Sequence, residues 1–180
     1  MDPDEADLVA AARAGDEDAW EVLYRRAYPR LRAYLARRLG PGEGEDAVHE
    51  TMTRAVAGLD RYQVGPAGFD GWLFGIARHV SADHHRRQAR SKRRAVAMAP
   101  DPQASGEPDE GLVVSEEHAQ VRRAFQALSE GDRELLELRV VAGLSAEQVA
   151  AVLRRRPGAV RTAQSRALAR LREQLERDDG

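Results

Sequence analysis

Hydrophobic residues recur at the three- and four-residue spacing of a buried helix face along almost the whole chain. In the first half of the chain, three separate apolar stripes cover residues 16–39, 45–59 and 69–80. The segment 60–68 has turn-forming residues and no period, which predicts a loop, and Pro29 should kink the first stripe. The alternation of apolar and polar residues that is typical of a half-buried strand occurs nowhere. The sequence therefore predicts an all-α fold.

A break in the helical pattern divides the chain into two parts. Between residues 95 and 117 lie three of the eight prolines, and every charged residue there is acidic. A segment this polar and proline-rich cannot bury enough apolar surface to offset the entropy of ordering it. The sequence therefore predicts two small helical domains, residues 1–95 and 115–180, joined by a flexible acidic linker of residues 96–114. We expect these domains to sit apart, each with its own core and a free basic face.

Positive charge is concentrated in two blocks, although the net charge is only −2. Residues 78–94 contain seven basic residues and one acid, and residues 154–172 contain seven arginines and no acid. Such blocks on an otherwise acidic body are typical of proteins that bind the phosphate backbone of a nucleic acid. The alternative for either block is a helix face that meets water or forms salt bridges.

Composition excludes several classes of function. The chain has no cysteine, which removes disulfides, thiolate metal sites and thiol nucleophiles. No apolar run approaches the roughly 20 residues of a membrane span, and the acidic N-terminus is unlike a signal peptide. Neither a glycine-rich phosphate loop nor a nucleophile elbow is present. We therefore expect a cytoplasmic protein with no membrane insertion, no enzyme activity and no cofactor.

Three histidines and one aspartate on the third predicted helix are a candidate for a metal-dependent nuclease site. They are His79, Asp83, His84 and His85. Positions 79 and 83 share a helix face, whereas 84 and 85 point elsewhere, so three ligands are not expected to converge on one ion. The spacing therefore predicts no metal site.

The second half of the chain contains a helix-turn-helix pattern. Ser145 and Gln148 have the form of a capping box that opens a short helix, and residues 154–157 form a turn before a longer basic helix. One side of the longer helix carries polar residues that can reach base edges and phosphates in a major groove: Arg161, Thr162, Ser165 and Arg166. The alternative is a helical hairpin whose basic face meets water or an acidic partner.

Aromatic rings lie in sequence beside the first basic block. Tyr62 falls in the predicted loop, and Phe69 and Trp72 open the helix that follows. Rings beside positive charge are how single-stranded nucleic acid is often held, by base stacking in a basic groove. Phe69 and Trp72 also fit the apolar stripe, which favours a packing role for each of them.

Several motifs in both halves resemble one family. The segments EDAVHETMTRA (45–55), LDRY (59–62), FDGWLFGIAR (69–78) and DHHRR (83–87) resemble conserved region 2 of the extracytoplasmic-function sigma factors of bacterial RNA polymerase. The segments LSEGDRELLELR (128–139), GLSAEQVA (143–150) and GAVRT (158–162) are similar to region 4 of the same family. The resemblance implies a region-2 helical bundle, a region-4 helix-turn-helix domain and a role in promoter-specific transcription initiation.

The resemblance also implies roles for individual residues. Those docking on core polymerase would be Asp46, His49, Glu50, Thr53 and Arg54. Those binding and melting the minus-10 element would be Arg61, Tyr62, Trp72, Arg78, His79, His84, Arg86 and Arg87. Those reading the minus-35 element would be Arg155, Arg156, Arg161, Thr162, Ser165 and Arg166. The implied partners are core RNA polymerase, through its β′ clamp helices and β flap, promoter DNA and an anti-sigma factor, all in the cytoplasm or on the nucleoid.

Three positions depart from the family pattern. His79 stands where an Asn is frequent, Arg154 where the turn of the helix-turn-helix often has Gly, and Ala163 where an Arg is common. Two other functions fit the same basic faces: a helix-turn-helix regulator that binds DNA without recruiting polymerase, and an adaptor that binds acidic proteins.

Overall fold

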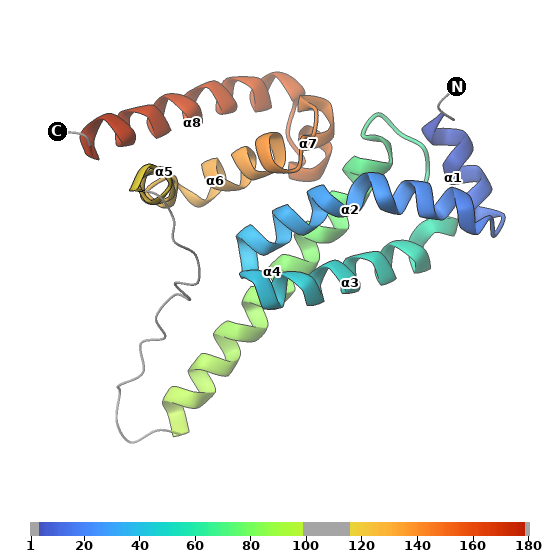
Figure 1. Cartoon of the computed structure of the whole chain (residues 1–180), viewed down its shortest axis with the longest axis horizontal. Coiled ribbons are helices and arrows are strands. Elements are labelled where there is room, and N and C mark those ends of the chain that lie inside the picture. The colour runs from blue at the N-terminus through green and yellow to red at the C-terminus, as the bar shows by residue number, and fades with distance from the viewer. Residues whose placement is uncertain (1–3, 99–115, 179–180) are drawn as a thin grey trace.

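The structure, a computed structural model, describes residues 4–98 and 116–178. Within these ranges the regular elements are helices only (Figure 1): α1 (Glu5–Arg13), α2 (Glu17–Leu39), α3 (Pro41–Gly58), the 3₁₀ turn η1 (Leu59–Arg61), α4 (Gly68–Met98), α5 (Glu116–Gln126), α6 (Glu130–Leu136), the π-helical turn η2 (Glu137–Val141), α7 (Ala146–Leu153) and α8 (Pro157–Asp178). The predicted all-α fold is confirmed. None of the described helices combines the length and the apolarity needed to cross a bilayer.

Local sequence explains where the helices of the first half begin. The carboxylate of Asp16 accepts a hydrogen bond from the backbone N–H of Ala19 at 3.1 Å and caps α2. Helix α3 begins at Pro41, earlier than the apolar stripe indicated, because proline at the first helical position loses no needed N–H and its φ already suits a helix. Helix α2 continues through Pro29.

The core of the first half lies between α2, α3 and α4. Leu31 and Tyr34 of α2 and Phe74 of α4 are fully buried, and the rings of Tyr34 and Phe74 meet edge to face with centroids 5.6 Å apart. Burying a side chain of this size contributes about 1.5–3 kcal/mol. Helix α1 closes one end of the bundle through Leu8 and Val9.

Caps also define the helices of the second half. The hydroxyl of Ser129 accepts from the N–H of Asp132 at 3.2 Å and caps α6. The predicted capping box of α7 is confirmed: the Ser145 hydroxyl accepts from the Gln148 N–H at 3.1 Å, and the Gln148 side chain accepts from the Ser145 N–H at 2.8 Å. Helix α6 is followed without a break by η2, which ends at Val141.

The turn between α7 and α8 has an unusual backbone conformation. Arg154 lies in the left-handed region, with φ 53° and ψ 46°, and it is the one described residue other than glycine with positive φ. This is the position at which the family often has glycine. A side chain with a Cβ in this region costs about 1–2 kcal/mol. Helix α8 then begins at Pro157, which suits a first helical position.

The two halves pack against each other. Helix α7 lies on the first part of α4, and η2 lies on α2. Buried residues of both halves form one continuous cluster, so the expectation of two separate cores is wrong. The reason is that α7 is short and mainly apolar, and it buries one side under α8 and another on α4. The first three residues of the predicted linker continue α4, and residues 99–114 lie outside the described residues.

Candidate nucleic-acid interface

The six residues predicted to read the minus-35 element share the exposed side of α8 and the turn before it. All are exposed: Arg155, Arg156, Arg161, Thr162, Ser165 and Arg166. The opposite side of α8 is buried through Val160 and Ala167, whereas Leu168 is 41% exposed. Helix α8 thus presents a polar, basic N-terminal half on an apolar base, as insertion into a groove requires.

Some of these side chains have partners within the protein. The guanidinium of Arg161 forms an ion pair with Glu147 of α7 at the surface. Hydrogen bonds from its own backbone N–H and from the Ser145 hydroxyl, together with the charge of Arg161, hold the pKa of Glu147 below its usual value. The Thr162 hydroxyl donates to the carbonyl of Gly158 at 3.1 Å. Because the Arg161 pair is exposed and screened by water, a phosphate can compete for it.

Arg139 holds the helix-turn-helix in place, a role that no sequence pattern predicted. Its Nε donates to the side-chain oxygen of Gln164 in α8 at 2.7 Å, and its Nη1 donates to the carbonyl of Leu144 in the turn before α7. One side chain from η2 therefore holds both helices of the motif. Periodicity could not reveal this role, because it depends on which residue of α8 lies opposite η2.

The second half of α4 forms the other basic surface. Its exposed cations are Arg86, Arg87, Arg90, Lys92, Arg93 and Arg94. Arg86 forms an ion pair with Asp83, and Arg87 lies 3.5 Å from Glu50, yet more than half of each of the two arginine side chains remains exposed. The surface can therefore attract a polyanion without losing a buried ion pair.

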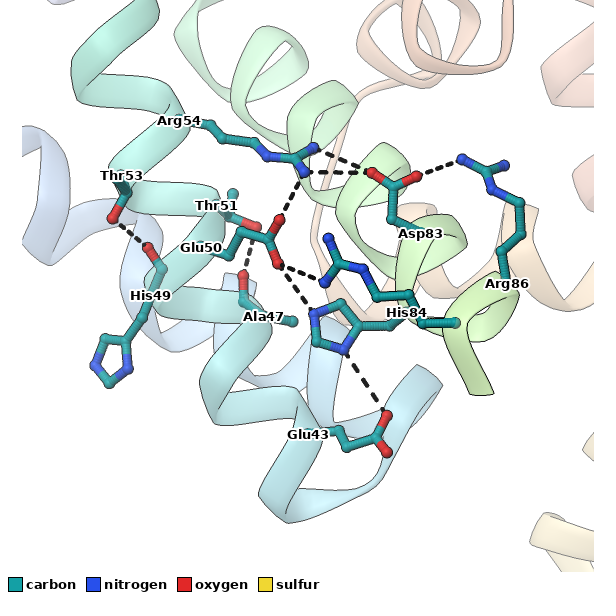
Figure 2. A network of polar contacts seen from close by, with 11 residues as sticks. Glu43, Ala47, His49, Glu50, Thr51, Thr53, Arg54, Asp83, His84 and Arg86 are labelled. Atoms are coloured by element: carbon teal, nitrogen blue, oxygen red, sulfur yellow. Dashed lines mark hydrogen bonds and ion pairs between the residues drawn. The ribbon is translucent and has the colours of Figure 1, made fainter. Parts of the chain in front are cut away.

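A network of charged side chains joins α3 to α4 (Figure 2). Glu50 of α3 accepts hydrogen bonds from Arg54 at 2.6 Å and from His84 at 3.1 Å, and Arg54 reaches Asp83 at 3.3 Å. Burial by itself raises the pKa of Glu50, but the His84 hydrogen bond and the charges of Arg54 and Arg87 outweigh it, so the net shift is downward. The hydrogen bond from Arg86 and the contacts of Arg54 likewise lower the pKa of Asp83. Of the predicted docking residues, Glu50 and Arg54 thus brace α3 against α4.

The network places His84 between two carboxylates of α3. Its ring lies between Glu50 and Glu43, with Nδ1 3.8 Å from the Glu43 carboxylate, and only 14% of the side chain is exposed. His84 therefore faces α3. His79 points elsewhere, with Nδ1 2.7 Å from the carbonyl of Gly75, so these two histidines diverge as the helix geometry predicted.

Three predicted docking residues remain exposed on the outer face of α3. They are Asp46, His49 and Thr53. Val56 follows Thr53 on the same face and is 55% exposed, although the apolar stripe placed it in the core. The outer face of α3 thus offers an acid, two polar groups and an apolar side chain to a protein partner.

A cleft of about 770 Å³ opens between the loop after η1, the first part of α4 and the end of α7. Arg61, Trp72 and His79 line one side, and Ala151 and Arg154 line the other. In this cleft, residues predicted for the minus-10 element meet the helix-turn-helix motif.

The ring of Tyr62 is not free to stack on a base beside this cleft. It is only 4% exposed and packs on Trp72 and Phe69, with ring centroids 4.9 and 6.2 Å away. Phe69 is equally buried, as its place in the apolar stripe favoured. Tyr62 therefore acts as a core residue, and although both rings line the cleft, Trp72 is the more exposed of the two.

Charged contacts fasten the two halves together behind the cleft. The guanidinium of Arg78 in α4 pairs with Glu134 of α6, with Nε–Oε1 at 2.9 Å and Nη2–Oε2 at 3.4 Å. Arg38 of α2 donates to Glu137 of η2 at 2.8 Å and to the Ser81 hydroxyl at 2.9 Å. Burial raises the pKa of Glu137, and the charge of Arg38 opposes that shift. A residue predicted to bind the minus-10 element, Arg78, is therefore occupied by a carboxylate of the other half.

Comparisons with known proteins agree with this geometry. Residues 23–91 match the family Sigma-70 region 2, and residues 118–171 match Sigma-70, region 4. The chain is 33% identical to the ECF RNA polymerase sigma factor SigD of Mycobacterium tuberculosis (strain ATCC 25618 / H37Rv) over 174 residues, covering 93% of this chain and 82% of SigD. It is 35% identical to the ECF RNA polymerase sigma factor ShbA of Streptomyces griseus, covering 92% of each chain.

Two solved structures share the arrangement of helices. CnrH, solved in complex with the cytosolic domain of CnrY, has a TM-score of 0.68 at 28% identity, covering 95% of this chain and 96% of that one. The sigma factor RpoE of Bartonella quintana, solved with the anti-sigma factor NepR, has a TM-score of 0.66 at 25% identity, covering 87% and 96%. With both sigma regions matched in order and close relatives along nearly the whole length, the chain belongs to the ECF sigma factors of RNA polymerase, which are transcription initiation factors.

Proposed function

We propose that this sigma factor docks on core polymerase through the outer face of α3, holds the minus-10 element with α4 and the loop before it, and reads the minus-35 element with α8. Exposure of basic residues on two separate helices, α4 and α8, is the observation that carries this assignment. The predicted domains, residues 1–95 and 115–180, divide these tasks.

The exposure and contacts of each predicted residue decide which binding surface we assign it to. On α8 and in the turn before it, the reading residues are those already predicted, since all six are exposed. On the minus-10 side the exposed or half-buried candidates are Arg61, Trp72, Arg78, His79, Arg86 and Arg87. Tyr62 and His84 leave this set, and on α3 the docking face consists of Asp46, His49, Thr53 and Val56. Melting needs no chemical step, because binding of unstacked bases offsets the few kcal/mol that unstacking costs.

We also propose that the two halves separate when the promoter binds. The minus-10 strand and Glu134 compete for Arg78, and α7 stands at the mouth of the cleft that Trp72 lines. A Cβ at Gly71 of α4 would lie 3.7 Å from the Cβ of Gln148 in α7, so the two helices are in contact beside the cleft. DNA therefore gains access to this side of α4 when α6 and α7 move away.

An anti-sigma protein is a further proposed partner. RpoE of Bartonella quintana was solved with its anti-sigma factor NepR. For this chain the outer face of α3 suits such a partner, because a protein covering it would exclude core polymerase. The site of action would be the cytoplasm, and the nucleoid when the sigma factor is bound to polymerase.

In vitro transcription tests the proposal. Purified core polymerase and the full chain are incubated with a promoter library, and transcript starts are sequenced. We expect starts that share one minus-10 and one minus-35 sequence. Binding to the same DNA without any transcript would instead support a helix-turn-helix regulator. Association with DNA that does not weaken with salt would refute both assignments, because phosphate contacts release counterions.

A further inference from the structure

Helix α1 contacts both ends of the loop that lies between Arg61 and Gly68. It packs on α4 and η1 as well as on α2, and its Leu8 and Val9 are buried. The match to Sigma-70 region 2 begins at residue 23, so α1 lies outside the part of the chain that the family comparison covers. Its charged residues are not accounted for by docking on polymerase or by DNA binding.

Arg13, in the last turn of α1, holds the entrance of the loop. Its Nε donates to the carbonyl of Leu59 at 2.8 Å, and its Nη2 donates to the carbonyl of Asp60 at 3.4 Å. Its guanidinium also lies 5.9 Å from the ring centroid of Tyr62. One side chain therefore satisfies carbonyls at the end of a helical segment and contacts the first residue of the loop.

Glu5, in the first turn of α1, holds the exit of the loop. Its Oε1 accepts a hydrogen bond from the backbone N–H of Phe69 at 2.7 Å, across 64 residues of sequence. A Cβ at Gly68, where φ is +61°, would lie 2.7 Å from the same oxygen, so glycine permits this approach. A carboxylate at the first turn of α4 also meets the positive end of the helix dipole.

These two contacts act on one short segment. Burial raises the pKa of Tyr62, the charge of Glu5 raises it further, and the charge of Arg13 lowers it, so both charges reach the same ring. Glu5 and Arg13 are eight residues apart, or about 12 Å at about 1.5 Å per residue of helix. A rigid helix thus fixes the separation of the loop ends, while the residues between them, 63–66, stay exposed.

We propose that Glu5 and Arg13 are positioning residues for the loop at 62–67, and that α1 thereby sets the base preference of this sigma factor at the minus-10 element. The inference rests on the proposed function, in which this loop meets the minus-10 strand. A loop whose ends are held in place loses less conformational entropy on binding, and it presents its exposed groups in one arrangement.

Two variants that remove the loop contacts, Glu5→Ala and Arg13→Ala, test the proposal in the holoenzyme. The matched controls are Asp7→Ala on the exposed side of α1 and Arg25→Ala, whose side chain is 75% exposed on α2. Promoter libraries are randomised separately at the minus-10 and minus-35 elements. We expect the loop variants to lose about fivefold in minus-10 base preference, the effect of one lost capping bond, with minus-35 preference unchanged. The controls should match the parent protein.

Hydrogen exchange of the free full-length chain provides the second readout. Backbone amides at 63–69 should exchange about fivefold faster in the two loop variants, and no faster in the controls. A purely structural role would lower the melting temperature and weaken selection at both promoter elements equally, which would overturn the proposal. If hydrogen exchange at 63–69 is the same in the loop variants as in the parent protein, the proposal is overturned, whatever the transcription assay shows. Absence of promoter-specific transcripts from the parent protein would refute the proposed function instead, and loop exchange would then decide the role of α1 alone.

Discussion

Glu134→Gln should make the free sigma factor bind minus-10 DNA more tightly. Glu134 accepts two hydrogen bonds from Arg78, at 2.9 and 3.4 Å, and lies 3.9 Å from Arg38, while only 15% of its side chain is exposed. A hydrogen bond to a charged group contributes about 1.5–3 kcal/mol, and the glutamine oxygen would retain part of this. The contact between the two halves should therefore weaken by about 1.5–2 kcal/mol.

That loss shifts the balance between closed and open chains by roughly 10- to 30-fold. If promoter DNA binds the open form, the apparent Kd is the intrinsic Kd divided by the open fraction. The variant should then bind a labelled single-stranded minus-10 oligonucleotide up to roughly 10- to 30-fold more tightly. The change also weakens the contact that holds Arg78, so its guanidinium is more available to a phosphate, which acts in the same direction.

Fluorescence anisotropy measures the affinity, and energy transfer between dyes measures the separation of the halves. The chain has no cysteine, so Ala57→Cys on α3 and Ala169→Cys on α8 give two exposed labelling sites. Transfer should fall in the variant. The control is Glu21→Gln, which removes an exposed carboxylate that pairs with Arg25. A variant with lower thermal stability but unchanged affinity and unchanged energy transfer would show that the Glu134 contact does not restrict access to α4.

The remaining predictions concern the two binding faces, the turn of the helix-turn-helix and the α3–α4 network. Arg166→Ala should weaken minus-35-dependent transcription about tenfold, the effect of losing one base or phosphate contact, and leave recovery with core polymerase in a pull-down unchanged. Asp46→Arg should do the reverse, reducing recovery with core polymerase while the melting temperature stays constant, because Asp46 is exposed. Arg154→Gly should stabilise the chain by roughly 1 kcal/mol in denaturant unfolding, since relief of the left-handed strain exceeds the entropy that glycine adds to the unfolded state. The pKa values of Glu50 and Asp83 lie below their ordinary 4.5 and 3.8. The two carboxylates therefore contribute their full stability above these ordinary values, and this stability is lost as the pH falls through the lower pKa values of the folded state. Circular dichroism against pH should show the loss, and the loss should be smaller in Glu50→Gln.

Features that depend on neighbouring residues could be predicted from the sequence. The capping box of Ser145 and Gln148, the helix-turn-helix, the exposed face of α8 and the position of Arg154 in a turn all follow from side chains a few residues apart. Helical periodicity identified the buried stripes for the same reason. Resemblance to a family supplied the docking and reading roles, which no local pattern could have named.

Other features depend on which elements meet, and periodicity says only that a face is buried, not against what. Tyr62 was expected to offer a free ring, but α1 and α4 enclose it. His84 was expected to face DNA, but α3 places two carboxylates beside it. The Arg78–Glu134 pair joins residues 56 apart, and the Glu5 contact with the N–H of Phe69 spans 64. Such contacts form because helices with apolar faces pack where their shapes allow, and polar side chains then pair with whatever charge the packing brings near.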